Sequence, residues 1–576
     1  MSSERSPLLS GKRTDIPRYN DEDSDGYDSD GHITILTSNP PSSRGSIDST
    51  ALVPHIPVED EGEALVKKRL NGAPLITVLF GLWIGVCLSS LDSTIVATIY
   101  PQIGTEFKRS NEIIWIATSY MLSYTALQPL YGRISDVFGR KSAIMFAGTI
   151  FFIGSFMCGA ATDMWMLVIA RGIAGIGGGG LNCMTTVISS DLVPLRERGK
   201  YQGYGNVAYA IGSVVGAPLG GFITESLGWR YCFYINLPLL VLPLYVSTFL
   251  IRNYNLDESS GESVYQKLKK IDYVGAITIV SAVVLFLLAT TLGGNIRPWS
   301  DPVVIGCLIG SIIFAVAFCL VEAKFSAFPI MPWSIISSQT PLACSMANLC
   351  CIMSSTALIY ITPIFFQGLL GYKASTAGLY FLPKVAASSS GSVLSGVYMS
   401  RTGEYRKLTI VAAFGIFLSV IGHCFWMSNT STAFIISCLF FEGFFTGVLI
   451  TTTLISMLSS VGIAEMATIT SMSYLFRSIG GVNGISITSA IFQSTVKKIL
   501  TAKITGPNAE EYIEIARKSM TEVRSLLPPD VLNIVLDSYQ TALRYAFISC
   551  AVISVFTLLS TFYIQRFELA TKVRSK

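Results

Sequence analysis

The sequence predicts an all-α membrane protein, and three observations lead to that fold class. Hydrophobic residues make up 51% of the 576 residues and charged residues only 14%, well below the roughly 25% of a typical soluble domain. Apolar runs of about 20 residues, long enough to cross a bilayer as a helix, recur along the chain. Basic residues gather on alternate connections between these runs. This pattern excludes a soluble enzyme, a secreted module and a nucleic-acid-binding protein.

Residues 1–73 predict a disordered cytosolic tail. They are rich in Ser, Asp, Pro and Gly and show no apolar periodicity, so they cannot bury enough surface to offset the entropy of ordering. Within the tail, Glu4 stands four residues before the pair Leu8 and Leu9. This spacing resembles the acidic dileucine signal that clathrin-type adaptor complexes read for delivery to a lysosome or vacuole. A chance match is the alternative.

Fourteen apolar runs follow the tail, and each predicts a transmembrane helix. They lie at roughly 74–98, 113–131, 142–161, 164–187, 201–223, 231–251, 272–292, 302–321, 341–365, 375–399, 407–427, 433–458, 467–492 and 543–565. With the N-terminus in the cytosol, 21 basic residues flank the runs on the inside and 5 lie on the short outside loops. This bias places both termini in the cytosol. The long loop 493–542 then faces the outside or the lumen of an organelle.

The connection after the second run carries a motif at residues 132–141, with the sequence GRISDVFGRK. It resembles the cytosolic-loop signature of the major facilitator superfamily. The resemblance implies a tight turn with fixed charges that controls gating. The residues involved are Gly132, Arg133, Asp136, Gly139 and Arg140. Asp136 is expected to face a helix N-terminus or a basic side chain in the other half of the protein, a charge lock that favours the outward-open state.

Four further stretches resemble the fourteen-spanner drug:proton antiporter branch of that superfamily. They are residues 91–97, the arginine–glycine segment 171–180, the glycine-rich segment 212–221 and residues 229–238. The resemblance implies two six-helix bundles, 74–251 and 341–565, joined by a linker, 252–340, that holds two extra helices; 566–576 form the C-terminus. It also implies a gating role for Gly212, Gly216, Pro218 and Gly220. Pro218 stands one residue later than in the usual Gly-Pro pair, which weakens any inference about the direction of transport.

A closer resemblance is to fungal vacuolar basic amino acid transporters. It rests on residues 90–97, 128–132, 179–182, 196–204 and 216–221. This resemblance implies that Lys, His and Arg are substrates and that the protein resides in the vacuolar membrane, with the plasma membrane as the alternative. The dileucine pattern agrees with a vacuolar destination.

Ionisable residues within the apolar runs are the candidate proton- and substrate-binding groups, because a charge at bilayer depth is costly. Asp92 is a candidate proton or cation site, or a helix-packing residue. Arg171 is expected to hold the carboxylate network. Glu442 stands among phenylalanines, which suits proton exchange or a cationic substrate through cation–π contact; the alternative is a glutamate near the end of its run that reaches the membrane interface. Arg477 is a candidate partner of a substrate carboxylate, or a gate, whereas Lys384 is expected to reach the membrane interface.

The sequence therefore predicts a proton-coupled transporter that moves basic amino acids into the vacuole by alternating access. No phosphate-binding loop is present, so a proton gradient is the expected energy source. No catalytic constellation, cofactor or metal site is expected, and Asn429 is only a weak glycosylation site. The expected partners are a cationic amino acid, protons, the lipid bilayer and an adaptor complex. The alternatives are a plasma-membrane multidrug or siderophore:proton antiporter and a nutrient sensor that binds without transporting.

Overall fold

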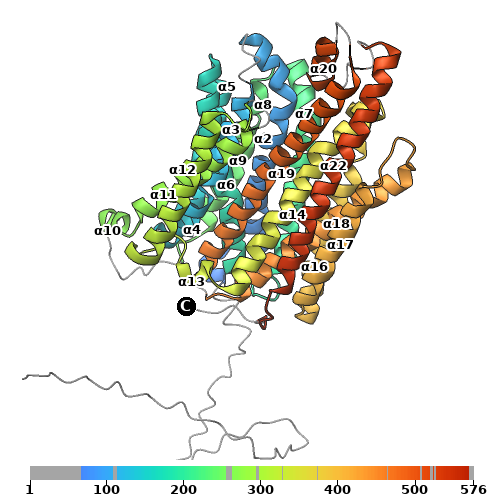
Figure 1. Ribbon diagram of the computed structural model, residues 1–576. Coiled ribbons are helices and arrows are strands. Elements are labelled where there is room, and N and C mark those ends of the chain that lie inside the picture. Colours follow the sequence, from blue (N-terminus) through green and yellow to red (C-terminus); the bar gives the residue numbers. More distant parts are fainter. Residues whose placement is uncertain are drawn as a thin grey trace, which may run out of the picture. The chain divides into compact units, whose positions relative to one another are not determined.

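The computed structural model describes residues 66–107, 113–254, 263–293, 297–326, 328–372, 374–462, 465–505, 509–518, 523 and 527–569. Within these residues the structure is helical and contains no β-strand, and Figure 1 shows the long helices packed side by side. This confirms the predicted all-α class. The predicted disordered tail up to residue 65, with its dileucine motif, lies outside the described residues.

Three groups of helices follow one another along the chain. The first comprises α2 (Leu75–Glu106), α3 (Ile114–Ala126), α4 (Gln128–Phe138), α5 (Arg140–Gly159), α6 (Met164–Leu192), α7 (Arg198–Ser226), α8 (Tyr231–Tyr234), α9 (Asn236–Tyr245) and the π-helix η2 (Val246–Leu250). The second comprises α10 (Val264–Lys269), α11 (Tyr273–Leu292), α12 (Pro302–Leu320), η4 (Val321–Phe325) and α13 (Trp333–Ile336). The third comprises α14 (Gln339–Pro363), η5 (Ile364–Leu369), α15 (Ala374–Leu379), α16 (Leu382–Thr402), α17 (Arg406–His423), α18 (Thr432–Ser459), α19 (Met466–Lys503), α20 (Ala509–Lys518) and α22 (Pro529–Phe562). We call the first and third groups the N-terminal and C-terminal bundles.

Ten helical segments of the described chain are long and apolar enough to cross a membrane, or eleven if the bent α7 is counted. Each of the fourteen predicted runs coincides with helical structure. The runs 113–131, 375–399 and 467–492 do not meet the same criterion. The first is divided between two short helices, and α16 and α19 are long enough but rich in Ser, Gly and other polar residues. The number fourteen therefore stays a prediction.

The packed body begins by residue 66 rather than at 74, where the sequence analysis ended the tail. Leu70 is fully buried in the apolar core of the N-terminal bundle. Arg69 donates a hydrogen bond from Nη1 to the backbone carbonyl of Asp191, at 2.7 Å. The sequence did not indicate this earlier start, because one buried leucine and one hydrogen-bonded arginine do not form a recognisable pattern within a polar segment.

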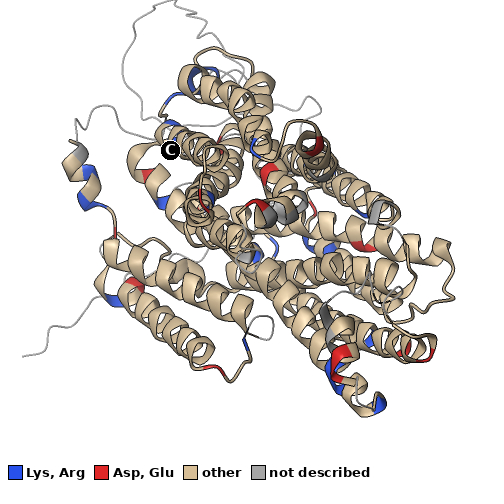
Figure 2. Ribbon diagram, turned by 90° about the horizontal axis from the view of Figure 1, so that it is seen from above, with Lys and Arg blue, Asp and Glu red and all other residues tan. Residues whose placement is uncertain are grey.

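Charged residues are sparse on these helices. In Figure 2, which looks down on the helices of Figure 1, most of the ribbon is tan. The exposed apolar side chains of α12, such as Ile309, Ile312 and Ile313, are what a lipid-facing helix requires, because apolar surface is stable against hydrocarbon. The described helices therefore have the surface of a multi-pass membrane protein.

The two bundles meet at the end of the molecule that carries the turn between α4 and α5, which we call the α4–α5 end. Arg196 donates hydrogen bonds from Nε and Nη2 to the backbone carbonyls of Ser400 (2.6 Å) and Arg401 (2.7 Å), at the last turn of α16. Nearby, Gly199 of α7 and Gly396 of α16 bring the two backbones together: a Cβ added at Gly396 would lie 2.3 Å from the carbonyl carbon of Gly199.

Further hydrogen bonds between the bundles lie in the same half of the helices. They join Thr186 to Tyr474 (2.7 Å), Ser478 to Gln128 (3.0 Å) and Asn206 to Ser392 (3.1 Å). Within the described residues, no hydrogen bond between the bundles is found nearer the α20 end. The protein is therefore closed at the α4–α5 end, and this closure determines where the central cavity lies.

Candidate functional site

A cavity of about 680 Å³ lies between the two bundles. Its wall contains residues of α2, α3, α6 and α7 from the N-terminal bundle, of α14, α18 and α19 from the C-terminal bundle, and of α11. Seven aromatic side chains contribute to this wall: Trp83, Tyr120, Tyr124, Tyr201, Tyr209, Tyr360 and Tyr474. Arg477 is the single charged residue among those described that line it. A mostly apolar cavity with a few polar groups, shared by two halves of a protein, is a typical small-molecule site.

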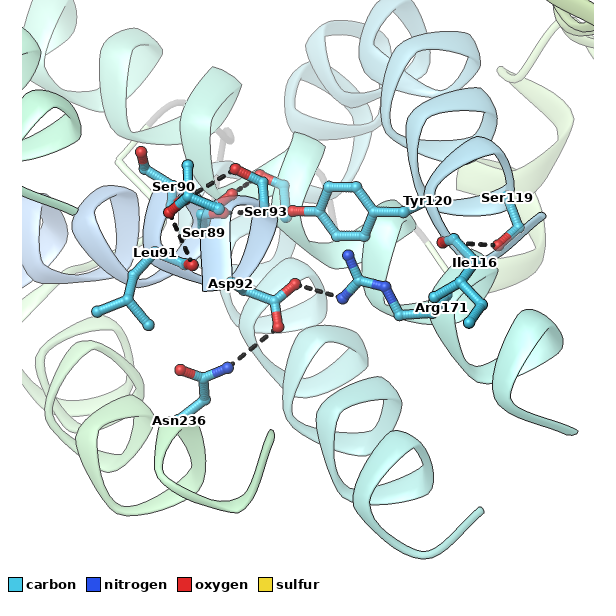
Figure 3. A network of polar contacts seen from close by, with 12 residues as sticks. Ser89, Ser90, Leu91, Asp92, Ser93, Ile116, Ser119, Tyr120, Arg171 and Asn236 are labelled. Atoms are coloured by element: carbon cyan, nitrogen blue, oxygen red, sulfur yellow. Dashed lines mark hydrogen bonds and ion pairs between the residues drawn. The ribbon is translucent and has the colours of Figure 1, made fainter. Parts of the chain in front are cut away.

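The N-terminal bundle holds a buried ion pair beside this cavity. Asp92 of α2 and Arg171 of α6 are both almost inaccessible to solvent, and Arg171 Nη1 lies 2.6 Å from Asp92 Oδ2. Asn236, at the start of α9, donates from Nδ2 to Asp92 Oδ1 at 3.1 Å. Figure 3 shows the Asp92 carboxylate pointing toward both partners. The carboxylate is therefore satisfied on both oxygens, and neither member of the pair lines the cavity.

Tyr120 of α3 connects the pair to the cavity. Its ring centroid lies 4.2 Å from Cζ of Arg171, which is close enough for a cation–π contact, and the same residue lines the cavity wall. Figure 3 shows the ring beside the guanidinium group. The Tyr120 residue therefore contacts both the Arg171 guanidinium and the cavity.

The predicted gating glycines of α7 bring that helix against α2 on both sides of Asp92. A Cβ at Gly212 would lie 2.2 Å from the carbonyl oxygen of Cys87, and a Cβ at Gly216 would lie 2.0 Å from Thr94 Oγ1. Only glycine permits this approach. The helix bends by 40° between the segments Arg198–Gly216 and Pro218–Ser226, as expected where a proline interrupts the backbone hydrogen bonds.

A second buried ion pair lies in the C-terminal bundle. Glu442 of α18 is 1% exposed, and its Oε2 lies 2.8 Å from Nζ of Lys384 on α16. Lys384 also donates to the backbone carbonyl of Ser355 at 3.3 Å, and Thr446 donates to Glu442 Oε1 at 3.3 Å. The expectation that Lys384 reaches the membrane interface is wrong, because the lysine turns inward to the one carboxylate available on α18. Neither residue lines the cavity.

Arg477 of α19 differs from Arg171 and Lys384. Its Nη2 donates to the backbone carbonyl of Ile450 at 2.8 Å, and its guanidinium lies 5.5 Å from the ring centroid of Tyr474. Its Nε is buried without a hydrogen-bond partner. No carboxylate in the described parts of the chain forms an ion pair with it. The structure therefore places one of the four predicted binding residues at the cavity and buries the other three behind its wall.

The charges of the α4–α5 turn form a network inside the N-terminal bundle. Arg140 pairs with Asp136 Oδ1 at 2.7 Å and with Asp191 Oδ2 at 2.8 Å. The ion-pair partner of Asp136 therefore lies in its own motif rather than in the other half of the protein, and the alternative expectation of a helix N-terminus stays a prediction. Burial raises the pKa of the Asp136 carboxyl above its ordinary value, although the nearby Arg140 acts in the opposite direction. At Gly139, φ is +94° and a Cβ would lie 2.4 Å from Asn253 Oδ1, so this turn requires glycine.

Two other residues of this motif contact neighbouring segments. A Cβ at Gly132 would lie 2.5 Å from Ser471 Oγ of α19, so Gly132 permits the close approach of the two bundles. Arg133 donates to the carbonyl of Lys270 at 3.4 Å and its guanidinium lies 5.7 Å from the ring centroid of Phe328. This arginine thus contacts the segments on both sides of α11 and α12.

Two peripheral predictions concern Gly220 and Asn429. Gly220 is buried, and its carbonyl accepts a hydrogen bond from Thr224 Oγ1. Asn429 is exposed in the turn between α17 and α18, where the neighbouring Thr430 accepts a hydrogen bond from the backbone N–H of Met427. The sequon is therefore part of an ordered turn.

Sequence reasoning missed three contact residues of the buried pairs. Asn236 lies within the motif at 229–238, but nothing in that motif indicates that its side chain reaches Asp92. Tyr120 is an ordinary aromatic residue of an apolar run. Lys384 follows a proline near the start of a run and was assigned to the interface. Helical spacing within one run does not reveal contacts between runs.

The comparisons with known proteins agree with this architecture. The family model described as Major Facilitator Superfamily matches residues 82–485. Multidrug resistance protein fnx1 of Schizosaccharomyces pombe is 38% identical over 86% of this chain and 94% of its own length. The vacuolar membrane amino acid uptake transporter fnx2 of the same yeast is 35% identical over 95% of this chain and 94% of its own length. Vacuolar basic amino acid transporter 2 of Saccharomyces cerevisiae is 31% identical over 77% and 96%.

Proposed function

Since the chain belongs to the major facilitator superfamily, and is thus a multi-pass transporter of small molecules rather than an enzyme, we propose that it moves basic amino acids (Lys, His, Arg) into the vacuole in exchange for protons. The observation that carries this proposal is the cavity between two bundles whose hydrogen bonds to one another, among the described residues, lie toward the α4–α5 end. Such an arrangement suits alternating access, in which two rigid halves rock about a central site.

The proposed orientation follows from the loops at the closed end. The turns at residues 139, 193–197 and 403–405 all lie at the α4–α5 end, and these are the connections that the basic-residue bias assigns to the cytosol. With both termini cytosolic, the structure corresponds to the state whose cavity faces the vacuolar lumen. This is the state that releases a substrate taken up from the cytosol and accepts a proton from the acidic side.

Support for a cationic amino acid comes from relatives and from the cavity wall. Two relatives are named as vacuolar amino acid transporters, and one of these names specifies basic amino acids. The wall offers a cation seven aromatic rings and no carboxylate among the described residues. Aromatic faces attract ammonium and guanidinium groups by about 0.5–2 kcal/mol each. The substrate cation is therefore received by rings rather than by Asp92 or Glu442.

Glu442 and Asp92 are the proposed proton sites, and the pair of Glu442 with Lys384 is the better suited. A carboxylate that takes up a proton releases its partner cation. The released cation then needs another acceptor. Lys384 already donates to the backbone carbonyl of Ser355 at 3.3 Å, so its ammonium keeps a hydrogen bond when Glu442 takes up one proton. Arg171 depends on Asp92 for its ion pair, so protonation of Asp92 leaves a buried guanidinium without its counter-ion. Proton uptake at Glu442 is therefore the less costly of the two.

Lysine uptake into isolated vacuolar vesicles tests this assignment. The wild-type protein is expected to concentrate labelled lysine only when a pH gradient is present. Glu442→Gln, which imitates the protonated form, is expected to lower gradient-driven uptake at least tenfold while exchange of lysine for lysine survives. Asp537→Asn, an exposed carboxylate on α22, serves as the matched control. Gradient-driven uptake by Glu442→Gln at the wild-type rate removes Glu442 from the coupling mechanism.

A multidrug antiporter is the second candidate function, and the aromatic wall favours it. Flat apolar drugs also bind between aromatic rings, and one relative is named a multidrug resistance protein. Two alternatives remain: a siderophore antiporter of the plasma membrane, and a nutrient sensor that binds its ligand without transporting it. Absence of lysine uptake together with export of a lipophilic cation would favour the antiporter, and binding of lysine without transport would favour the sensor.

Delivery to the vacuole is proposed to depend on the tail motif, which lies outside the described residues. Replacing both Leu8 and Leu9 by alanine is expected to move a fluorescent fusion from the vacuolar rim to the cell surface, because an adaptor complex then loses the two apolar side chains that it reads. The replacement of Ser2 and Ser3 by alanine is the control. Fluorescence that stays at the vacuolar rim in the leucine variant shows that the motif is not used.

A further inference from the structure

Three cations are buried in the middle of the bundles, and the structure gives only two of them a carboxylate. Arg171 pairs with Asp92 at 2.6 Å and Lys384 pairs with Glu442 at 2.8 Å. Arg477 is 8% exposed, and no such pair is found for it anywhere in the described residues. It is also the single charged residue of the three that lines the central cavity.

An unpaired guanidinium at this depth is unfavourable. Arginine cannot shed its proton in a protein, and the effective penalty for taking one ion out of water is several kcal/mol when no counter-ion accompanies it. The carbonyl of Ile450 and the ring of Tyr474 offset part of this cost. Nε remains without a hydrogen-bond partner. A buried cation that lines a cavity and has no carboxylate partner among the described residues is suited to an anion that arrives with a ligand.

From this contrast we infer that Arg477 is the carboxylate-binding group of the cavity, so that the transported molecule must carry a carboxylate. This inference deepens the proposed function, on which it rests. The guanidinium of Arg477 receives the α-carboxylate of the amino acid, and the aromatic wall receives its cationic side chain. The ligand class is therefore a carboxylate with an apolar or cationic extension, and a diamine that lacks the carboxylate is expected to bind more weakly.

Three small molecules separate the contributions of the ligand's carboxylate and ammonium groups to binding. L-lysine has a carboxylate and two ammonium groups, 6-aminohexanoate lacks only the α-ammonium, and cadaverine lacks only the carboxylate. Their binding is measured with the purified full-length protein by calorimetry or by ligand-dependent thermal unfolding. Wild-type protein is expected to bind L-lysine and 6-aminohexanoate at least tenfold more tightly than cadaverine, because a charge-assisted contact to a carboxylate is worth this much.

Variants of Arg477 complete the test. Arg477→Gln is expected to weaken L-lysine and 6-aminohexanoate binding about 10–100-fold and to leave cadaverine binding unchanged. Arg477→Lys keeps the charge but not the two-pronged geometry and is expected to lie in between. Lys503→Gln removes a cation from the same helix outside the cavity, where Lys503 pairs with Asp537 at 2.6 Å, and is expected to bind like the wild type.

The outcomes separate this inference from the proposed function. Equal binding of L-lysine and cadaverine by the wild type overturns the role of Arg477 and leaves basic amino acid transport standing. This comparison needs no variant, so a variant that fails to fold does not prevent it. Binding of 6-aminohexanoate but not of L-lysine, lost in Arg477→Gln, supports the carboxylate site and contradicts the proposed substrate.

Discussion

Asp92→Asn is expected to lower the midpoint of thermal unfolding more than any other single substitution in the N-terminal bundle. The substitution leaves Arg171 charged and buried without a counter-ion, because the side chains of Asn236 and Tyr120 supply no negative charge. Removing one partner of a buried ion pair costs about 3–5 kcal/mol. Arg171→Leu is expected to cost less, because the Asp92 carboxyl that it leaves behind can be neutralised by a proton.

The double variant Asp92→Asn/Arg171→Leu separates stability from transport. Because it removes both charges, its unfolding midpoint is expected to return most of the way toward that of the wild type. If the ion pair takes part in transport, lysine uptake stays low in this well-folded double variant. An unfolding midpoint of Asp92→Asn within error of the wild type contradicts the buried pair itself. Wild-type uptake by the double variant restricts the pair to a structural role.

The sequence was sufficient to predict those features of the fold that depend on one apolar run at a time. Whether 20 residues prefer lipid to water is decided by their own composition, so each predicted run coincides with helical structure. The predicted runs 142–161 and 164–187 also leave a break between α5 and α6, and in the structure the Asp163 side chain caps α6 there by accepting a hydrogen bond from the backbone N–H of Trp165 at 3.0 Å. The glycine-rich segment 212–221 was given a gating role by resemblance only, and the structure adds that Gly212 and Gly216 lie at close contacts between α7 and α2.

The candidate site could be predicted only as a set of unmatched charges. Asp92, Arg171, Glu442 and Arg477 were all recognised because ionisable residues are rare at bilayer depth. Which cation pairs with which carboxylate depends on how different helices pack against one another. Asp92 and Arg171 are 79 residues apart in the sequence, and Lys384 and Glu442 are 58 residues apart. The lack of a carboxylate partner for Arg477 could not be predicted either, because it follows from the pairing of Asp92 with Arg171 and of Glu442 with Lys384. Asp136 is a different case, because its partner Arg140 stands only four residues away and the i,i+4 spacing could have indicated the pair.

Gly396→Val is expected to hold the protein open at the α4–α5 end and to suppress transport. The new Cβ would lie 2.3 Å from the carbonyl carbon of Gly199, which belongs to the backbone of the other bundle and cannot turn aside as a side chain can. The helices α7 and α16 must then separate. Overpacking of this kind costs about 1–3 kcal/mol, which shifts the balance between the closed and open states by about 5–150-fold.

The effect is confined to one conformation, because Gly396 contacts the facing bundle whereas the apolar core of its own bundle is built from other residues. The unfolding midpoint of Gly396→Val should therefore change little while lysine uptake falls by about the same 5–150-fold. A cysteine placed at Ser400, whose carbonyl accepts from Arg196 in the closed state, should react faster with a water-soluble thiol reagent in this variant. Gly306→Val adds the same side chain to α12 at a position with no atom within 4 Å, and should leave both measurements unchanged. Wild-type uptake and unchanged labelling in Gly396→Val would show that the contact between Gly199 and Gly396 is not part of the closure.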